Sequence, residues 1–235
     1  MSSVWAVVPA AGSGRRMAAE VPKQYLKLNG VPILEHTLRA LLACPDIRGV
    51  VVVLDPSDRR ADAIPSLSDP RVSTAAGGDE RADSVLSGLR AIAAEAGEQD
   101  WVLVHDAARP CISVAVLHSL ITSCVSEGVG TVMAQASVDT LKRVSDDNRV
   151  VETLDRRTIW RAQTPQMFKL AELTLALSSA LANDTAITDE SMAMELAGYP
   201  VSILEGPSTN IKITVPADLE IAEIILRRLS EESKA

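Results

Sequence analysis

Short, wholly apolar segments alternate along the chain with segments in which apolar residues recur every three or four positions. The apolar segments predict buried β-strands at residues 4–8, 50–54, 72–75, 101–104, 130–134 and 201–204. The periodic segments predict amphipathic helices around residues 34–42, 85–93, 117–124 and 219–229. Strands that are apolar throughout, rather than at every second residue, are typical of parallel sheets covered on both sides. The pattern therefore predicts an α/β fold with a mostly parallel, Rossmann-like sheet and helices on both faces.

Residues 138–153 break this rhythm, because apolar and polar positions alternate there on either side of the polar turn 145–148. This pattern predicts a β-hairpin. A hairpin cannot bury its own apolar side, so we expect it to pack on something else, with another copy of the chain as the candidate. We expect a single domain over residues 1–235 with a protruding dimerisation arm at about 136–158, and no second catalytic domain after the last helix.

The composition supports an aliphatic core. Hydrophobic residues make up 47% of the 235 residues but aromatic residues only 3%, so Val, Ile, Leu and Ala must fill the interior. The formal net charge of -8 argues against non-specific nucleic-acid binding, so that any phosphate chemistry must be local.

The cysteines and the amino terminus bear on the compartment. Cys44, Cys111 and Cys124 are widely spaced with no CxxC pair, which predicts neither a disulfide framework nor a zinc site. The first apolar run has no preceding positive charge and ends at Pro9, which is too short for a signal peptide. No stretch approaches the ~18 apolar residues of a membrane span. We expect a cytoplasmic protein that does not bind membranes.

The first predicted strand leads directly into Pro9-Ala10-Ala11-Gly12-Ser13-Gly14-Arg15-Arg16, with Lys23 close behind. Small residues allow backbone N–H groups to approach an anion, and the basic residues add full charges, so the loop is suited to a polyphosphate. It lacks the Gly-Lys pair of a Walker A loop and the third small residue of a dinucleotide fingerprint. The alternative is a plain turn with solvated arginines.

Two further loops follow predicted strands at the same edge of the sheet. Asp106 follows residues 101–104, where one carboxylate and several waters could hold a Mg²⁺ ion on a nucleotide; the alternative is a helix N-cap. Gly77, Gly78 and Ser84 follow residues 72–75 and could contact a base edge, or form only a turn and a cap.

Lys212 is the only charged residue in the segment Asn210-Ile211-Lys212-Ile213-Thr214. A lysine among apolar residues must be paired or bound to an anion, although a lysine on an edge strand can also serve to prevent aggregation.

The three histidines, His36, His105 and His118, form no arrangement with a serine or cysteine nucleophile, and we expect them to be structural. Transfer to a phosphate that is already a dianion requires no general base.

Taken in order along nearly the whole chain, the first loop, GGDERADSV at 77–85, VHDAARP at 104–110, AQTPQ at 162–166, ITDE at 187–190 and NIKIT at 210–214 resemble the 2-C-methyl-D-erythritol 4-phosphate cytidylyltransferases of the non-mevalonate isoprenoid route. The resemblance implies a homodimeric enzyme that joins CTP to a sugar-alcohol phosphate and uses Mg²⁺ or another divalent cation such as Mn²⁺.

The resemblance also implies roles for individual residues, each of which is an expectation here. Arg16 and Lys23 would stabilise the developing phosphate charge, with Arg156 and Lys212 also catalytic. CTP would contact Pro9, Ala10, Ala11, Gly12, Ser13, Gly14, Arg15, Gly78, Asp79 and Ser84. The sugar-alcohol phosphate, which is the acceptor, would contact Asp106, Ala107, Arg109, Thr140, Thr164 and Thr188, with Asp106 also the metal ligand. Thr140 and Arg156 would reach the site from the partner's arm.

The expected mechanism is in-line attack by the acceptor phosphate on the α-phosphorus of CTP, promoted by positioning and charge. Two anionic substrates repel each other, so clustered cations are required. The alternatives are a ribitol-5-phosphate cytidylyltransferase, which shares the architecture, and a catalytically silent nucleotide-binding regulator. A dehydrogenase is disfavoured because the dinucleotide fingerprint fails.

Overall fold

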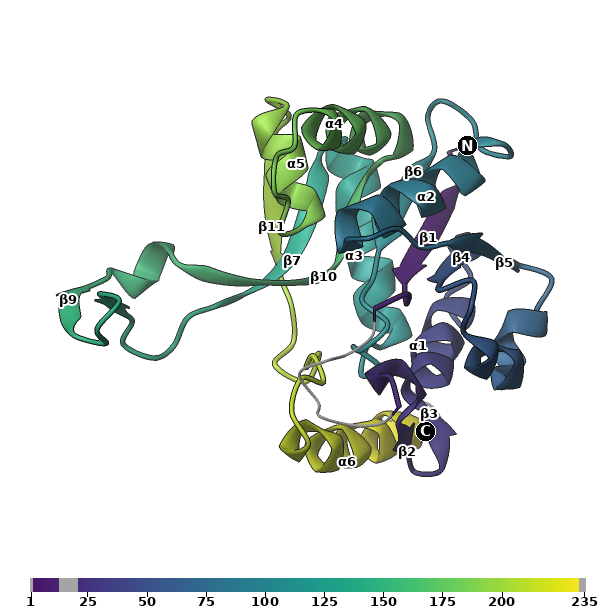
Figure 1. Ribbon diagram of the computed structural model, residues 1–235, viewed down its shortest axis with the longest axis horizontal. Helices are drawn as coiled ribbons and strands as arrows, with labels where there is room; N and C mark the ends of the chain where they lie inside the picture. The colour runs from purple at the N-terminus through teal and green to yellow at the C-terminus, as the bar shows by residue number, and fades with distance from the viewer. Residues whose placement is uncertain (1, 13–20, 233–235) are drawn as a thin grey trace.

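The structure is a computed structural model that describes residues 2–12 and 21–232. Its centre is a seven-stranded sheet in the order β11-β7-β10-β6-β1-β4-β5 (Figure 1). The strands are β1 (Val4–Pro9), β4 (Ile47–Leu54), β5 (Val72–Ala76), β6 (Trp101–Val104), β7 (Gly130–Ala136), β10 (Trp160–Lys169) and β11 (Val201–Glu205). All six predicted strands are confirmed, with ends shifted by a few residues at most.

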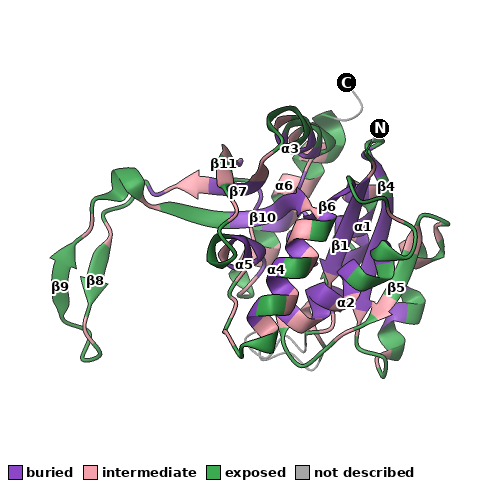
Figure 2. Ribbon diagram, turned by 90° about the horizontal axis from the view of Figure 1, so that it is seen from above, coloured by how far each residue is buried: buried purple, intermediate pink, exposed green. Residues whose placement is uncertain are grey.

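Helices cover both faces of the sheet, as predicted. They are α1 (Ile33–Leu42), α2 (Arg81–Ala93), α3 (Val114–Glu127), α4 (Leu170–Ala182), α5 (Glu190–Leu196) and α6 (Ala217–Glu232). Because successive side chains of a strand point to opposite faces, Ala6 and Val8 pack with α1 and α3, whereas Trp5 and Val7 pack with α2, α4 and α5. The central strands are therefore buried on both sides (Figure 2), which explains why they are apolar throughout.

The sheet is mostly parallel because β1 pairs in parallel with β4 and β6, β4 with β5, and β7 with β11. The exception is β10, which lies antiparallel between β6 and β7. The sequence analysis predicted neither β10 nor helices α4 and α5. Parallel pairing brings the carboxyl ends of β1, β4, β5 and β6 to one edge, so the loops after β1, β5 and β6 meet there.

Smaller elements complete the chain. A hairpin of β2 (Lys27–Leu28) and β3 (Val31–Pro32) packs with α6 around a third apolar cluster that includes Leu28, Ile33 and Ile213. Short 3₁₀ helices are η2 (Lys23–Tyr25), η3 (Arg59–Ala63), η4 (Pro65–Ser68) and η5 (Arg156–Thr158). The segment around Lys212 forms no strand, and the backbone N–H of Ile213 instead donates to the carbonyl of Ala108 at 2.9 Å.

The predicted hairpin is present but shorter than its sequence pattern. Only β8 (Lys142–Val144) and β9 (Val150–Thr153) pair, and Asn148 in the turn adopts a φ of 59°. The hairpin projects away from the rest of the molecule as an arm (Figure 1), and both of its strands are exposed (Figure 2). Val138, Val150 and Val151 are 71%, 62% and 62% exposed, respectively, so none of the described residues of this protomer covers the apolar side.

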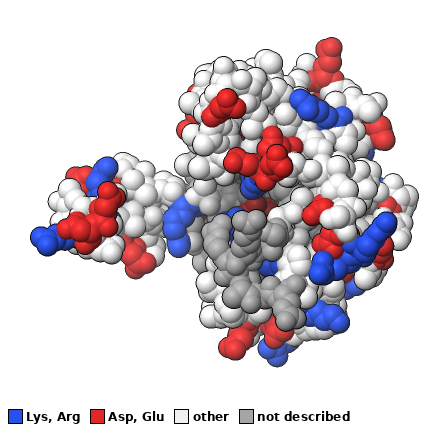
Figure 3. All heavy atoms as spheres, viewed as in Figure 1, with Lys and Arg blue, Asp and Glu red and all other residues white. Residues whose placement is uncertain are grey.

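On the face shown in Figure 3, acidic and basic side chains are interspersed, and the arm carries both signs. In the ranges that the structure describes, no helix is both long enough and apolar enough to span a bilayer.

Candidate active site

A cavity of about 700 Å³ opens at the edge of the sheet where β1, β5 and β6 end. Its wall comes from the loops after these strands, from η2 and from the segment before α6. The lining residues are Pro9, Ala10, Ala11, Gly12, Lys23, Gln24, Gly78, Asp79, Glu80, Arg81, Ser84, Asp106, Ala107, Ala108, Lys212 and Thr214. Segments far apart in the sequence therefore converge on one pocket.

The first loop is held in place by backbone contacts and one amide side chain. The N–H of Ala10 donates to the carbonyl of Val53 at 2.8 Å. The buried Gln24 donates from Nε2 to the carbonyls of Ala10 at 2.7 Å and Gly12 at 3.1 Å. These bonds fix the course of the first loop up to Gly12. Ser13, Gly14, Arg15 and Arg16 lie outside the described residues.

The loop after β5 packs directly against the first loop. A Cβ atom on Gly77 would lie 2.3 Å from Cβ of Ala11, and one on Gly78 would lie 2.4 Å from Cβ of Asp83, so neither position has room for a side chain. The buried hydroxyl of Ser84 accepts a hydrogen bond from the N–H of Gly78 at 3.2 Å. Close contact therefore requires glycine at both positions. Ser84, which was predicted to contact the base, also stabilises the loop that contains Gly78.

Asp106 is the electrostatic centre of the pocket. Its Oδ2 lies 2.8 Å from Lys212 Nζ and 3.6 Å from Arg109 Nε, and its Oδ1 lies 3.3 Å from the guanidinium of Arg81. Burial alone would raise the pKa of the Asp106 carboxyl, but Arg81 and Lys212 outweigh it and hold that pKa well below its usual range. Asp106 is therefore an anion whose charge is shared among three cations.

A buried polar network holds Asp106 from behind. The hydroxyl of Thr164 accepts from the backbone N–H of Asp106 at 2.9 Å and lies 3.2 Å from His105 Nδ1. His105 Nε2 lies 3.0 Å from the carbonyl of Arg109, which can only accept, so Nε2 carries the proton and Nδ1 accepts from Thr164. Burial lowers the pKa of His105 to about 4. His105 is therefore a neutral, structural histidine, as expected.

Asn210 extends this network to the segment that carries Lys212. Its fully buried side chain donates from Nδ2 to the carbonyl of Thr164 at 2.8 Å, and the backbone carbonyl of Asn210 accepts from Nη1 of Arg109 at 2.7 Å. The Thr164-Pro165 peptide bond is cis. Lys212 is thereby fixed relative to β10 and to the end of β6.

The predicted site residues divide into those in the pocket and those outside its lining. Pro9, Ala10, Ala11, Gly12, Lys23, Gly78, Asp79, Ser84, Asp106, Ala107 and Lys212 line it. Arg109 and Thr164 lie buried behind Asp106, and Thr188 is exposed beside Met192, with its Oγ1 3.5 Å from the sulfur. Thr140 and Arg156 are exposed residues of the arm, where Arg156 donates to the carbonyl of Val138.

Formal charges in the described lining balance. Three lining residues are positively charged, namely Lys23, Arg81 and Lys212, and three are negatively charged, namely Asp79, Glu80 and Asp106. The sequence analysis expected clustered cations, and in the part of the chain that the structure describes the cations of the lining are matched by as many carboxylates. Arg15 and Arg16, the two arginines predicted for the first loop, lie outside the described residues.

The sequence analysis assigned no role to Arg81, Gln24, Glu190 or Asn210, although all four lie in motifs that it quoted or beside them. Their roles depend on partners distant in sequence, such as Glu190 with Arg81. A charged or amide side chain next to a predicted loop or strand end was the available signal.

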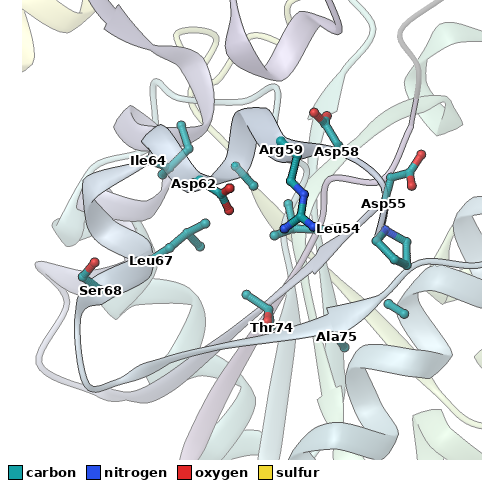
Figure 4. A pocket seen from close by; sticks show the side chains of 13 residues that line it. Leu54, Asp55, Asp58, Arg59, Asp62, Ile64, Leu67, Ser68, Thr74 and Ala75 are labelled. Atoms are coloured by element: carbon teal, nitrogen blue, oxygen red, sulfur yellow. The ribbon is translucent and has the colours of Figure 1, made fainter.

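A second cavity, of about 550 Å³, lies between β5 and the 3₁₀ helices η3 and η4 (Figure 4). Its wall carries Asp55, Asp58 and Asp62 but only one basic residue, Arg59. The formal charge of this wall is therefore negative, whereas the charges in the described lining of the first pocket balance, so the first pocket is the better site for a polyphosphate.

The fold and the first pocket together define a nucleotidyltransferase: a mostly parallel sheet whose first strand runs into a small-residue loop, with lysine and arginine around one buried carboxylate at the carboxyl edge.

The chain belongs to the 2-C-methyl-D-erythritol 4-phosphate cytidylyltransferase family, whose model matches residues 4–228. It is 52% identical over 216 residues to the enzyme of that name from Ectopseudomonas mendocina, covering 92% of each chain, and 47% identical over 228 residues to the one from Vibrio vulnificus, covering 97% of this chain and 96% of the relative. The crystal structure of the Francisella tularensis enzyme superposes with a TM-score of 0.81 at 35% identity, over 95% of this chain and 100% of that one. The predicted family and cytidylyltransferase function in non-mevalonate isoprenoid biosynthesis are confirmed.

Proposed function

We propose that the pocket around Asp106 binds CTP and 2-C-methyl-D-erythritol 4-phosphate together and joins them into 4-diphosphocytidyl-2-C-methyl-D-erythritol. A phosphate oxygen of the acceptor attacks the α-phosphorus of CTP, and the bond from that phosphorus to the β-phosphate breaks to release pyrophosphate. The observation that carries the proposal is the convergence of Lys23, Asp106 and Lys212 on one pocket beside the first loop.

The cytidine part of CTP would lie between the first loop and the loop after β5. Ala10, Ala11, Gly78 and Asp79 line this part of the pocket, where the alanines and the glycine leave room for a base to approach the backbone, and Gly77 allows the two loops to touch. Ser84 keeps the second loop in shape through its bond to Gly78. The base would be recognised largely through backbone hydrogen bonds, with Pro9, Gly12 and the undescribed residues Ser13, Gly14 and Arg15 next to the phosphates.

Charge would be stabilised by cations from both ends of the chain. Arg16 of the first loop and Lys23 of η2 would face the phosphates from one side, and Lys212 from the other. The acceptor phosphate, with a second pKa near 6, is largely a dianion at neutral pH and needs no base. This fits a pocket whose described lining contains no histidine.

The residues present fit a divalent cation that arrives with the nucleotide. In the described ranges, no group of three or more His, Cys, Asp or Glu side chains could hold a metal ion by itself. Mg²⁺ is commonly held by one or two carboxylates together with substrate phosphates and waters, and Asp106 is such a carboxylate. A bound Mg²⁺ or Mn²⁺ would neutralise phosphate charge. Asp106 would share its oxygens between the ion and Lys212.

The acceptor would lie on the Asp106 side of the pocket, near Ala107 and Thr188, with Arg109 and Thr164 supporting that wall from behind. We also propose a homodimer formed through the arm, residues 136–158, with Thr140 and Arg156 completing the partner's site. The exposed valines of the arm support this proposal. The three cysteines are buried free thiols, in keeping with a reducing cytoplasm.

The test is pyrophosphate release by the purified chain. We expect turnover only when CTP, 2-C-methyl-D-erythritol 4-phosphate and a divalent cation are all present, and loss of turnover with EDTA. Ribitol 5-phosphate, measured side by side, should be a much poorer acceptor. Equal or better turnover with ribitol 5-phosphate, or none with either acceptor, would contradict the proposal.

A further inference from the structure

Arg81 connects two acidic residues on different elements. Its Nη1 and Nη2 lie 2.5 Å and 3.2 Å from the two carboxylate oxygens of Glu190, and its Nε lies 3.3 Å from Asp106 Oδ1. Two parallel N–H···O contacts to one carboxylate fix both the position and the plane of a guanidinium. The edge of this guanidinium fork that carries Nε is then directed at Asp106.

Glu190 is the fixed end of this arrangement. Its side chain is 1% exposed, whereas that of Arg81 is 32% exposed and lines the nucleotide pocket. A buried carboxylate is costly unless a cation and hydrogen bonds compensate it, and Arg81 provides both. Glu190 begins α5, immediately after Asp189, which is anchored by a 2.9 Å hydrogen bond from Gln166 of β10. The anchor is therefore part of the folded core.

The position of Arg81 in the chain gives the contact its significance. Arg81 is the first residue of α2 and directly follows the loop of Gly78 and Asp79. It thus links three parts of the site: the loop expected to bind the base, the end of β6 and the start of α5.

The two oxygens of Asp106 have separate partners. Oδ1 faces Arg81, whereas Oδ2 faces Lys212 at 2.8 Å and Arg109 at 3.6 Å. If Arg81 released Oδ1, the carboxylate could rotate about its Cβ–Cγ bond and carry the Lys212 ammonium with it. A displacement of about 1 Å in such a site can cost on the order of 100-fold in rate.

We propose that Arg81, held in place by Glu190, is a positioning residue that sets the orientation of the Asp106 carboxylate and, through it, of Lys212. The proposal rests on the reaction proposed above. The role belongs to the guanidinium fork, because a lysine at this position carries the same charge but cannot span Glu190 and Asp106 at once.

The test is a double-mutant cycle on pyrophosphate release, with wild type, R81K, D106N and R81K/D106N. We expect R81K to lower kcat roughly 10- to 100-fold while the KM for CTP changes less than about threefold, because orientation rather than charge is lost. In the D106N background the same R81K change should have little further effect. The control is R90K, an exposed arginine farther along α2 that should behave as wild type.

The E190Q variant provides a second, independent test. The neutral amide has only one acceptor oxygen and cannot accept both N–H groups of Arg81, so E190Q should reproduce the R81K defect and add little to it in R81K/E190Q. Independent, multiplicative losses for R81K and D106N, or a wild-type kcat in R81K, would overturn the role of Arg81. A wild type that releases no pyrophosphate refutes the reaction instead, so the two failures are distinguishable. Circular dichroism and a melting curve for each variant separate loss of fold from loss of rate.

Discussion

The ammonium group of Lys212 lies 2.8 Å from Oδ2 of Asp106. A lysine from the irregular segment before α6 thus meets a carboxylate at the end of β6, and the carbonyl of Asn210 and the N–H of Ile213 hold that segment against Arg109 and Ala108. The pair ties the last part of the chain to the pocket walls that come from residues between Pro9 and Ala108. It also explains why a lysine is stable among apolar neighbours.

Replacing Lys212 by methionine should lower kcat by roughly 100- to 1,000-fold, because a positive charge close to the reacting phosphates is lost. Asp106 keeps Arg81 and Arg109, so the fold should persist. Steady-state kinetics and a melting curve check both expectations. Lys27→Met, an exposed lysine of β2, is the control. A Lys212→Met enzyme that turns over at the wild-type rate would exclude Lys212 from the reaction.

Replacing Lys23 by alanine should lower kcat by about 100-fold or more with the fold intact. Lys23 lines the pocket from η2, next to Gln24, which holds the carbonyls of the first loop. Gln24→Leu is the variant for comparison. It should raise the KM for CTP, because the first loop loses the hydrogen bonds that support it. Near-normal turnover in Lys23→Ala would refute its role in charge stabilisation.

Acid should destabilise the protein through His105. Its pKa is lowered to about 4, chiefly by burial, against an ordinary value of 6.5. Between these values the unfolded chain binds a proton that the folded chain does not, so the free energy of unfolding falls as the pH drops from 6.5 to 4. The lowering of the His105 pKa from 6.5 to about 4 corresponds to about 3 kcal/mol in the free energy of unfolding.

His105→Gln isolates this contribution, since glutamine can still donate to the carbonyl of Arg109 but does not titrate. Urea unfolding of both proteins at several pH values from 7 to 4.5 should show a shallower pH dependence for the variant. Identical slopes for the two proteins would show that His105 is not the titrating group.

Much of the fold follows from the sequence because it depends on local pattern. Ala6 and Val8 alternate with Trp5 and Val7 between two apolar clusters, and such runs are recognisable in isolation. Strand β10 was missed because Gln163, Thr164, Pro165 and Gln166 interrupt its apolar character. Gln163, Thr164 and Gln166 are tolerated because they bond to Asp106, Asp189 and Asn210, which lie far away in the sequence.

The site shows the same division. The loops containing Gly12, Gly78 and Asp106 could be predicted, because parallel strands bring their carboxyl ends together. The partners of Asp106 could not, since the approach of Arg81 depends on Glu190 of α5, an element that the pattern did not predict. Apolar periodicity indicates where elements lie, but not which charged side chains meet between them.

Mixing two inactive variants tests whether the arm completes the partner's site. If Arg156 acts across the dimer, Arg156→Ala and Lys212→Ala should each be nearly inactive alone, yet a mixed dimer has one intact site. Re-equilibrated mixtures in equal amounts should recover about a quarter of wild-type activity. No recovery, with exchange verified by native mass spectrometry, would mean that Arg156 does not act in trans.

The most direct test of the account is a crystal structure of the protein with CTP and Mg²⁺. The account predicts that the triphosphate lies between the first loop and Lys212, with its α-phosphate near Lys23, the metal ion on Asp106 and the cytosine against Gly78 and Ser84. Nucleotide bound in the cavity of Asp55, Asp58 and Asp62, or a triphosphate remote from Lys23 and Lys212, would contradict it.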